Sequence, residues 1–175
     1  MKRVMILGQP GSGKSTLAGK LGEVTGLPVV HMDKIHWKSG WVPRSEEEKL
    51  EMARAAMAED EWIFEGGFSR TWDERATRAD TLIWLDVGLA RRLWRVTYRF
   101  FRYFGQSRPD LPEGCEEGNW SEMWEFYQWI WNTRNSARHK MKQLIEKHEH
   151  DLDVLIMSRI PEVEAYLEGL RARTS

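Results

Sequence analysis

The stretch "GQPGSGKST", residues 8–16, follows a short apolar run near the start of the 175-residue chain. Gly8, Gly13, Lys14 and Ser15 fit the pattern G-x-x-x-x-G-K-[ST], with a strand expected before the pattern and a helix after it. Glycines allow consecutive backbone N–H groups to turn toward one anion, and the following helix adds the positive end of its dipole. The stretch therefore predicts a loop that binds the phosphates of a nucleotide.

Side chains of this loop have predicted roles in binding ATP and Mg²⁺. Lys14 is expected to reach the β- and γ-phosphates and to act in catalysis, and the Ser15 hydroxyl is the expected Mg²⁺ ligand. The sequence has no [NT]-K-x-D segment of the kind that GTPases use to read guanine, and it lacks the size and further motifs of a motor, which favours a small kinase. The residues predicted to bind the nucleotide here are Gly8, Gly11, Ser12, Gly13, Lys14, Ser15 and Thr16.

Length and composition predict one globular domain over residues 1–175. The net charge of −1 provides no overall attraction to nucleic acid or to acidic membranes, so neither is an expected partner. The apolar run at 4–7 is too short for a signal peptide, and no stretch approaches a transmembrane span. Together with the single Cys115, which cannot form an internal disulfide, these features predict a cytoplasmic protein.

Short apolar runs alternate with amphipathic stretches, which is typical of a parallel sheet covered by helices. The expected strands lie at 3–7, 28–32, 62–65, 81–86 and 153–157. They are dense in large apolar residues without strict alternation, as expected of strands buried on both faces. Helices are expected at 13–24, after the capping-box spacings Ser45/Glu48 and Thr71/Glu74, and from Pro161 onward. The fold class is therefore α/β, with a five-stranded parallel sheet and helices on both faces.

Strand signals stop between residues 89 and 149. Two helical stretches, at 89–104 and 120–148, flank a loop rich in Gly, Pro and acidic residues. This pattern predicts a helical insertion between the last two strands, in the position of a lid.

Three polar positions follow expected strands and should meet at one edge of the sheet, because ligands in such folds bind beyond the carboxyl ends of the strands. Asp33 follows the second strand, Glu65 ends the third and Ser158–Arg159 follow the fifth. Glu65 is placed to hold Mg²⁺ through water, unless it is a solvated carboxylate. Asp33 is a candidate to bind a substrate hydroxyl or to act as its base, the alternative being a helix or turn cap. Arg159 is expected on the nucleotide side.

Aromatic residues follow Asp33, where the acceptor should bind. Trp37 and Trp41 lie four residues apart, and their rings could stack a base or a sugar, with core packing as the alternative. His31 and His36 are predicted to be packing residues.

The helical stretch at 89–104 carries a cationic face and an aromatic face. The cationic face consists of Arg92, Arg95, Arg99 and Arg102, and the aromatic one of Trp94, Tyr98 and Phe101. Such a helix fits a lid whose arginines neutralise charge on the transferring phosphoryl group, and less well a nucleic-acid-binding face or a solvated surface. Arg134 and Arg138, on the later helix, are expected to supply the opposing side of the lid.

The helical stretch at 120–148 carries an aromatic stripe. Trp120, Trp124, Tyr127 and Trp131 lie on one side of it, after the possible cap Asn119. We expect this stripe to pack the inserted helices together. A dimer interface is the alternative, so the oligomeric state stays open between monomer and homodimer.

Two segments resemble parts of adenylate kinases. "WIFEGGFSRT" (62–71) is similar to the family segment L-L-D-G-F-P-R-T, with Glu65 at the acidic position and Arg70 at the arginine that binds the acceptor phosphate. "ADTLIWLDV" (79–87) resembles the next strand of the family. Arg95 and Arg99 resemble the arginines with which the lid segment of that family begins. The resemblance implies the strand order 2-3-1-4-5 of a P-loop NTPase fold, and an acceptor site that includes Gly67 and Arg70.

The combination "HMDKIHW…GW", "EGGF", "RPD" and a tryptophan-rich helix resembles bacterial proteins labelled "DNA topology modulation protein", small P-loop proteins grouped with adenylate kinases. This resemblance covers nearly the whole chain.

The sequence thus predicts an ATP- and Mg²⁺-dependent kinase that phosphorylates a small acceptor, in the first place a nucleotide or nucleoside. Asp33, Trp37, Gly67 and Arg70 are the expected acceptor-binding residues. One alternative is a kinase of a small hydroxyl-bearing metabolite, similar to shikimate or gluconate kinases. An alternative of another class is a nucleotide-gated, DNA-binding regulator.

Overall fold

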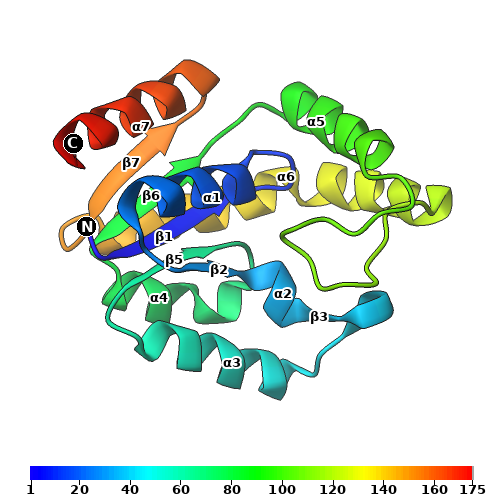
Figure 1. Ribbon diagram of the computed structural model, residues 1–175, viewed down its shortest axis with the longest axis horizontal. Coiled ribbons are helices and arrows are strands. Elements are labelled where there is room, and N and C mark those ends of the chain that lie inside the picture. The colour runs from blue at the N-terminus through cyan, green and yellow to red at the C-terminus, as the bar shows by residue number, and fades with distance from the viewer. Residues whose placement is uncertain (175) are drawn as a thin grey trace.

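The computed structural model describes residues 1–174, and its centre is a five-stranded parallel sheet (Figure 1). The strands are β1 (Arg3–Gly8), β2 (Val29–His31), β5 (Trp62–Glu65), β6 (Thr81–Leu85) and β7 (Asp153–Met157). Their spatial order is β2-β5-β1-β6-β7, so the order 2-3-1-4-5 is confirmed. β1 pairs with β5 through Val4 and Ile63 and with β6 through Val4 and Thr81. The α/β P-loop class of the sequence prediction is therefore the class of the fold.

A small second sheet was not predicted from the sequence. It consists of the two antiparallel strands β3 (Trp37–Lys38) and β4 (Val42–Pro43), joined by the 3-10 turn η1 (Ser39–Trp41). Gly40 has φ 73°, a left-handed conformation in which glycine is favoured, and it allows the tight reversal. The hairpin is too short to leave a periodic signal in the sequence.

Helices cover both faces of the main sheet, as predicted. They are α1 (Lys14–Thr25), α2 (Met32–His36), α3 (Glu46–Ala58), α4 (Trp72–Arg78), α5 (Leu89–Arg102), α6 (Trp120–His148) and α7 (Ile160–Thr174), with a 3-10 turn η2 (Ser69–Thr71) before α4. Val4 and Ile6 of β1 pack in the core beneath α1 and α7. Met5 and Leu7 point to the other core, which α2, α3, α4 and the end of α6 cover. The side-chain alternation of a single strand thus separates the two layers.

One of the two predicted capping boxes is present. At the start of α3 the Ser45 hydroxyl accepts from the Glu48 N–H (3.1 Å), and the Glu48 carboxylate accepts from the Ser45 N–H (2.9 Å). The box predicted from Thr71 and Glu74 is wrong. The Thr71 hydroxyl instead donates to the Phe68 carbonyl (3.1 Å) and accepts from Arg75 Nε (3.1 Å).

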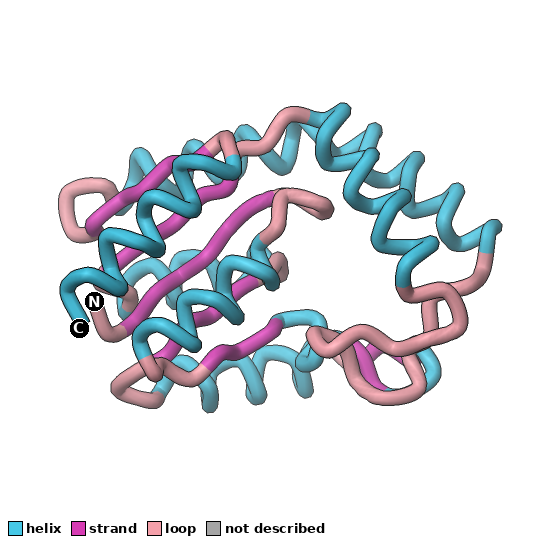
Figure 2. Tube along the Cα trace, turned by 45° about the horizontal axis from the view of Figure 1, so that its top comes forward, coloured by secondary structure: helices cyan, strands magenta, loops and turns pink. Residues whose placement is uncertain are grey.

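The helical insertion follows β6 and precedes β7 in the chain. Figure 2 shows α5 and the first part of α6 side by side, away from the sheet. The last turns of α6 behave differently, because Met141, Leu144 and Ile145 belong to the core between α6 and the sheet. The predicted insertion is therefore anchored at its end by the main core. No helix within residues 1–174 is both long and apolar enough to cross a membrane.

The expected packing role of the aromatic stripe on α6 is observed only for part of the stripe, because its tryptophans stay largely exposed. Trp120, Trp124 and Trp131 are 58%, 65% and 53% exposed. The buried residues on this part of the helix are Met123 and Ile130, on another face. Two members of the stripe contact α5. Tyr127 is hydrogen-bonded to the Thr97 hydroxyl, and the Trp120 ring packs against Phe100 and Phe101, with ring centroids 4.9 and 5.6 Å apart.

Candidate functional site

A cavity of about 1520 Å³ lies at the carboxyl ends of the strands. The ends of four strands reach it, at Gly8, His31, Leu85 and Met157. Its walls are the 8–16 loop, the α2–β3 segment, the loop after β5, helix α5, the 103–119 loop and the first part of α6. A cavity of this size exceeds the volume of a typical single-ligand pocket, so it has room for a nucleotide and an acceptor together.

The 8–16 loop has the geometry of a phosphate cradle. Gly11 has φ 77° and lies so close to α5 that an added Cβ would stand 2.4 Å from the Arg92 carbonyl oxygen. Gly13 has φ 100° and immediately precedes α1, where an added Cβ would stand 3.3 Å from Arg95 Nη1. Neither position accepts a side chain without strain, which leaves the loop backbone open toward the helix N-terminus.

The residues of this loop fit a nucleotide phosphate and its metal. The buried Ser12 hydroxyl has no hydrogen-bond partner among residues 1–174 and lies on the cavity wall. Lys14 and Ser15 occupy the first turn of α1 and also line the cavity, as does Thr16. Within residues 1–174 no group of three His, Cys, Asp or Glu side chains is arranged to hold a metal ion.

Asp33 lies where the acceptor side begins. It is in the first turn of α2, partly buried, and it lines the cavity. Burial, and then the charge of Glu65, raise the pKa of Asp33 above its ordinary value, while the charges of Lys14 and Arg108 act in the opposite direction. Asp33 is therefore a carboxyl group close to the phosphate loop whose proton is held more tightly than usual.

Glu65 has a different environment from the one expected of a metal-binding residue. Its side chain is 2% exposed and lies within 2.8 Å of His31 Nδ1. The carboxylate thus sits beneath the cavity wall, engaged by a histidine that the sequence suggested was only a packing residue. Access of Mg²⁺ to Glu65 would require this pair to open.

The 103–119 loop contributes charged residues that sequence reasoning missed. Arg108 is 8% exposed; its Nη1 lies 3.0 Å from the Asp110 carboxylate and its Nε 3.0 Å from that of Glu117. Arg99 of α5 approaches the same Glu117 at 3.7 Å. Although burial raises the pKa of Asp110, Arg108 and a hydrogen bond with Ser15 lower it overall. The loop thus places a cluster of ion pairs beside the phosphate loop.

The four predicted lid arginines separate into two pairs. Arg95 donates from Nη1 to the Ser12 carbonyl (2.7 Å), and Arg99 lines the cavity with it. The other two are not brought to the cavity. Arg138 forms a bidentate pair with Asp86, with Nη2 to Oδ2 at 2.7 Å, and the Arg134 guanidinium lies over the Trp131 ring (4.1 Å). Because Arg134 and Arg138 are four residues apart, they lie on the same face of α6, as expected. That face, however, points toward the end of β6 and toward solvent instead of the cavity.

The predicted acceptor-binding role of Arg70 is also not supported. Its side chain is 58% exposed and lies outside the cavity, next to Glu46 of α3 at 3.1 Å. The 3-10 turn η2 rotates Arg70 outward, whereas Gly66, Gly67 and Phe68 before it line the cavity.

Arg75, which has no predicted role, supports this segment from beneath. It is fully buried; Nη1 donates to the Gly66 carbonyl (3.2 Å), and Nη2 donates to the carbonyls of Gly67 and Phe68. Burial lowers the pKa of Arg75 to about 9, so it remains a cation at neutral pH.

We expect Arg75→Met to lower the free energy of unfolding by about 2–4 kcal/mol, because buried carbonyl groups lose their donor. Urea unfolding measures this change. The matched control is Arg54→Met, which breaks the exposed Arg54–Glu74 pair and should cost at most about 1 kcal/mol. Equal losses in the two variants would contradict a supporting role for Arg75.

Trp37 and Trp41 both line the cavity and are partly buried. Their rings meet edge to face, with centroids 5.4 Å apart. Arg159 lines the opposite end of the cavity, with a side chain that is 78% exposed. The structure thus brings the predicted nucleotide-side and acceptor-side residues to one cavity, apart from Arg70, Arg134, Arg138 and Glu65.

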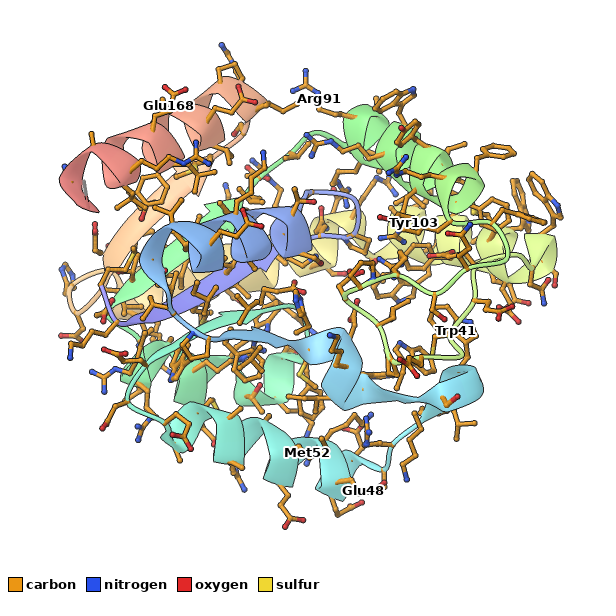
Figure 3. The ribbon with its side chains drawn as sticks, in the orientation of Figure 1. Trp41, Glu48, Met52, Arg91, Tyr103 and Glu168 are labelled. Atoms are coloured by element: carbon orange, nitrogen blue, oxygen red, sulfur yellow. The ribbon has the colours of Figure 1, made fainter. Side chains whose placement is uncertain are left out.

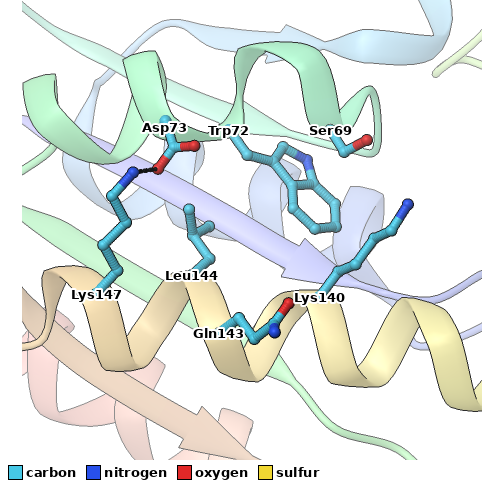
Figure 4. A pocket seen from close by; sticks show the side chains of 7 residues that line it. All are labelled: Ser69, Trp72, Asp73, Lys140, Gln143, Leu144 and Lys147. Carbon is cyan, nitrogen blue, oxygen red and sulfur yellow. Dashed lines mark hydrogen bonds and ion pairs between the residues drawn. The ribbon is translucent and has the colours of Figure 1, made fainter.

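A smaller cavity of about 240 Å³ lies between α4 and α6 (Figure 4). Ser69, Trp72 and Lys140 line both cavities, so the two adjoin. At its far end Lys147 pairs with Asp73. It contains no residue of the 8–16 loop among the described residues, and it is a side recess of the main site.

Neither a protein-family model nor the sequence of a curated protein matches the chain. Solved structures do match. A deoxyadenosine kinase from M. mycoides, with products dCMP and a flexible dCDP bound, is 12% identical with a TM-score of 0.51, over 98% of this chain and 97% of that one. A gluconokinase from Sinorhizobium meliloti 1021 is 15% identical with a TM-score of 0.51, over 99% and 95% of the two chains.

These likenesses show that the chain shares its α/β fold with a deoxyadenosine kinase and a gluconokinase. They agree with the kinase part of the resemblance noted in the sequence. They do not support the narrower resemblance to bacterial proteins labelled "DNA topology modulation protein".

Proposed function

We propose that the protein transfers the γ-phosphoryl group of ATP to a hydroxyl group of a small acceptor. The observation that carries the proposal is the position of Asp33, a carboxyl group on the wall of the cavity that also holds Lys14. A carboxylate near a phosphate loop suits an acceptor that must lose a proton. The similarity of the fold to a deoxyadenosine kinase and a gluconokinase supports a kinase.

The charges on the acceptor side favour a hydroxyl over a phosphate as the attacking group. Asp33, Asp110 and Glu117 line this part of the cavity, and the last two already engage Arg108. Arg70, the cation expected to bind an acceptor phosphate, lies outside. A second phosphate would therefore come near the carboxylates of Asp33, Asp110 and Glu117, whose repulsion a neutral hydroxyl does not meet.

In this reaction the acceptor oxygen attacks the γ-phosphorus, and the bond from that phosphorus to the bridging oxygen of ADP breaks. Asp33 accepts the proton of the hydroxyl, Lys14 stabilises charge on the transferring group, and Arg95 braces the loop that binds the phosphates. Ser15 is the residue that would hold Mg²⁺, which supplies charge neutralisation when bound. Acceptor-dependent ADP release, screened over nucleosides and hydroxyl metabolites, tests the proposal.

We expect Arg95→Ala and Arg99→Ala to lower kcat by about 10- to 100-fold and to change the affinity for ATP less. The physical reason is that a charged hydrogen-bond donor of the site is lost, and its interaction is strongest in the transition state. Steady-state kinetics with equilibrium ATP binding measures both quantities. Arg91→Ala is the matched control, because Arg91 is on the same helix but exposed and outside the cavity. If Arg91→Ala lowered kcat as much as the two cavity variants, α5 would not act as a lid.

A further inference from the structure

Two aromatic residues of the cavity have an unusual backbone conformation. Within residues 1–174, Trp41 (φ 59°) and Phe68 (φ 63°) are the non-glycine residues with positive φ. For bulky side chains this conformation is strained, and such strain persists where the surroundings impose it, often at ligand sites. Both residues line the main cavity, on its acceptor side.

Trp41 is fixed by contacts with two other segments. Its Nε1 donates to the Glu116 carbonyl of the 103–119 loop (2.9 Å), and Trp37 meets its ring at an interplanar angle of 82°. The same loop is tied to the hairpin by Cys115 Sγ, which donates to the Lys38 carbonyl (3.3 Å). Figure 3 shows Trp41 at this end of the molecule, beside the loop.

Phe68 is fixed from the other side of the cavity. Its carbonyl accepts from the Thr71 N–H (3.1 Å) and from Arg75 Nη2 (3.3 Å), and Lys49 Nζ lies 5.6 Å from its ring. Its ring nevertheless stays partly exposed, whereas Phe64 of the preceding strand is fully buried. Phe68 packs against the edge of the core that contains Phe64, and it also lines the cavity.

From this arrangement we infer that Trp37, Trp41 and Phe68 form an aromatic site for a planar ring of the acceptor, which makes the acceptor a nucleoside. Rigid, partly exposed aromatic rings stack face to face on flat π-systems, whereas an open-chain polyol or sugar acid has no flat ring to stack on them. A nucleoside also carries the hydroxyl that Asp33 requires. The inference rests on the proposed function, which requires an acceptor with a hydroxyl group. It adds that this acceptor is a nucleoside.

The test is calorimetric binding to the intact protein with Mg²⁺ and a non-hydrolysable ATP analogue present. The probes are deoxyadenosine, deoxycytidine and thymidine, with D-ribose and D-gluconate as comparison compounds that carry hydroxyl groups but no aromatic base. We expect at least one nucleoside to bind about 100-fold more tightly than either compound without a base.

Glycine variants at the two strained positions remove an aromatic ring without unfolding the protein. Phe68→Gly and Trp41→Gly suit the left-handed backbone and should keep the fold, and each is expected to weaken nucleoside binding by about tenfold or more. Trp41→Phe, which keeps a ring, should recover part of the affinity. The control Trp94→Leu removes an exposed tryptophan of α5 outside the cavity and should change nothing. Affinity for the ATP analogue reports that each variant still forms the nucleotide site.

The outcomes distinguish this inference from the proposed function. A nucleoside that binds through the aromatic residues but receives no phosphoryl group would support the inference and contradict the proposed function. A hydroxyl acceptor that is phosphorylated, and whose affinity is the same in Trp41→Gly, Phe68→Gly and the unchanged protein, would overturn the inference and leave the proposed function standing. D-ribose or D-gluconate binding as tightly as every nucleoside would also overturn it.

Discussion

Lys14→Ala is expected to reduce phosphoryl transfer by about 1000-fold while the protein stays folded. Lys14 is in the first turn of α1 on the cavity wall, where its charge faces the site of the transferring group. Loss of one preorganised electrostatic group of this kind costs on the order of 10²–10³ in kcat. Acceptor-dependent ADP release measures the loss.

The control for this variant is Lys142→Ala, which removes an exposed lysine of α6 outside both cavities. A thermal unfolding curve confirms the fold of each variant. Turnover in Lys14→Ala close to that of Lys142→Ala would rule out the 8–16 loop as the site of transfer.

Asp33→Asn is expected to lower kcat by about 10²–10⁴-fold and to leave ATP affinity nearly unchanged. Asparagine keeps the size of the side chain but cannot accept the hydroxyl proton. The pH dependence gives a second readout. Burial raises the pKa of Asp33, so its reactive, deprotonated form is lost at a higher pH than for an ordinary aspartate as the pH falls.

The acid limb of kcat/KM should therefore lie above the ordinary aspartate pKa of 3.8, and it should be absent in Asp33→Asn. Glu65→Gln provides a comparison, because the charge of Glu65 contributes to the shift. Its loss should move the acid limb to lower pH. An unchanged acid limb in Asp33→Asn would assign the titration to another group.

The main sheet was predictable because its signal is local and repeated. The stretch 62–65 is wholly apolar up to Glu65, and the observed β5 has these bounds. The capping box of Ser45 and Glu48 fixed the start of α3 for the same reason. The spacing of the glycines similarly identified the 8–16 loop, since few loops other than phosphate-binding loops require glycines at these positions.

The walls of the acceptor side were less predictable, because they depend on which way a few side chains turn. Arg70 and Arg75 are five residues apart. Arg70 lies in the 3-10 turn η2 and is exposed, whereas Arg75 lies in α4 and is buried. The Arg108–Glu117 contact joins residues of one loop that has no periodicity. The tryptophans of α6 misled for another reason. Tryptophan is highly buried on average, whereas all four tryptophans of this helix are more than half exposed.

The most direct test of a hydroxyl phosphotransferase is ³¹P NMR of the products formed from ATP and Mg²⁺ with each candidate acceptor. The proposed function predicts a new phosphate monoester resonance that grows in step with ADP, only when a hydroxyl acceptor is present, and that is missing with Asp33→Asn. ADP accompanied solely by inorganic phosphate, or a new diphosphate resonance formed from a nucleoside monophosphate acceptor, would contradict it.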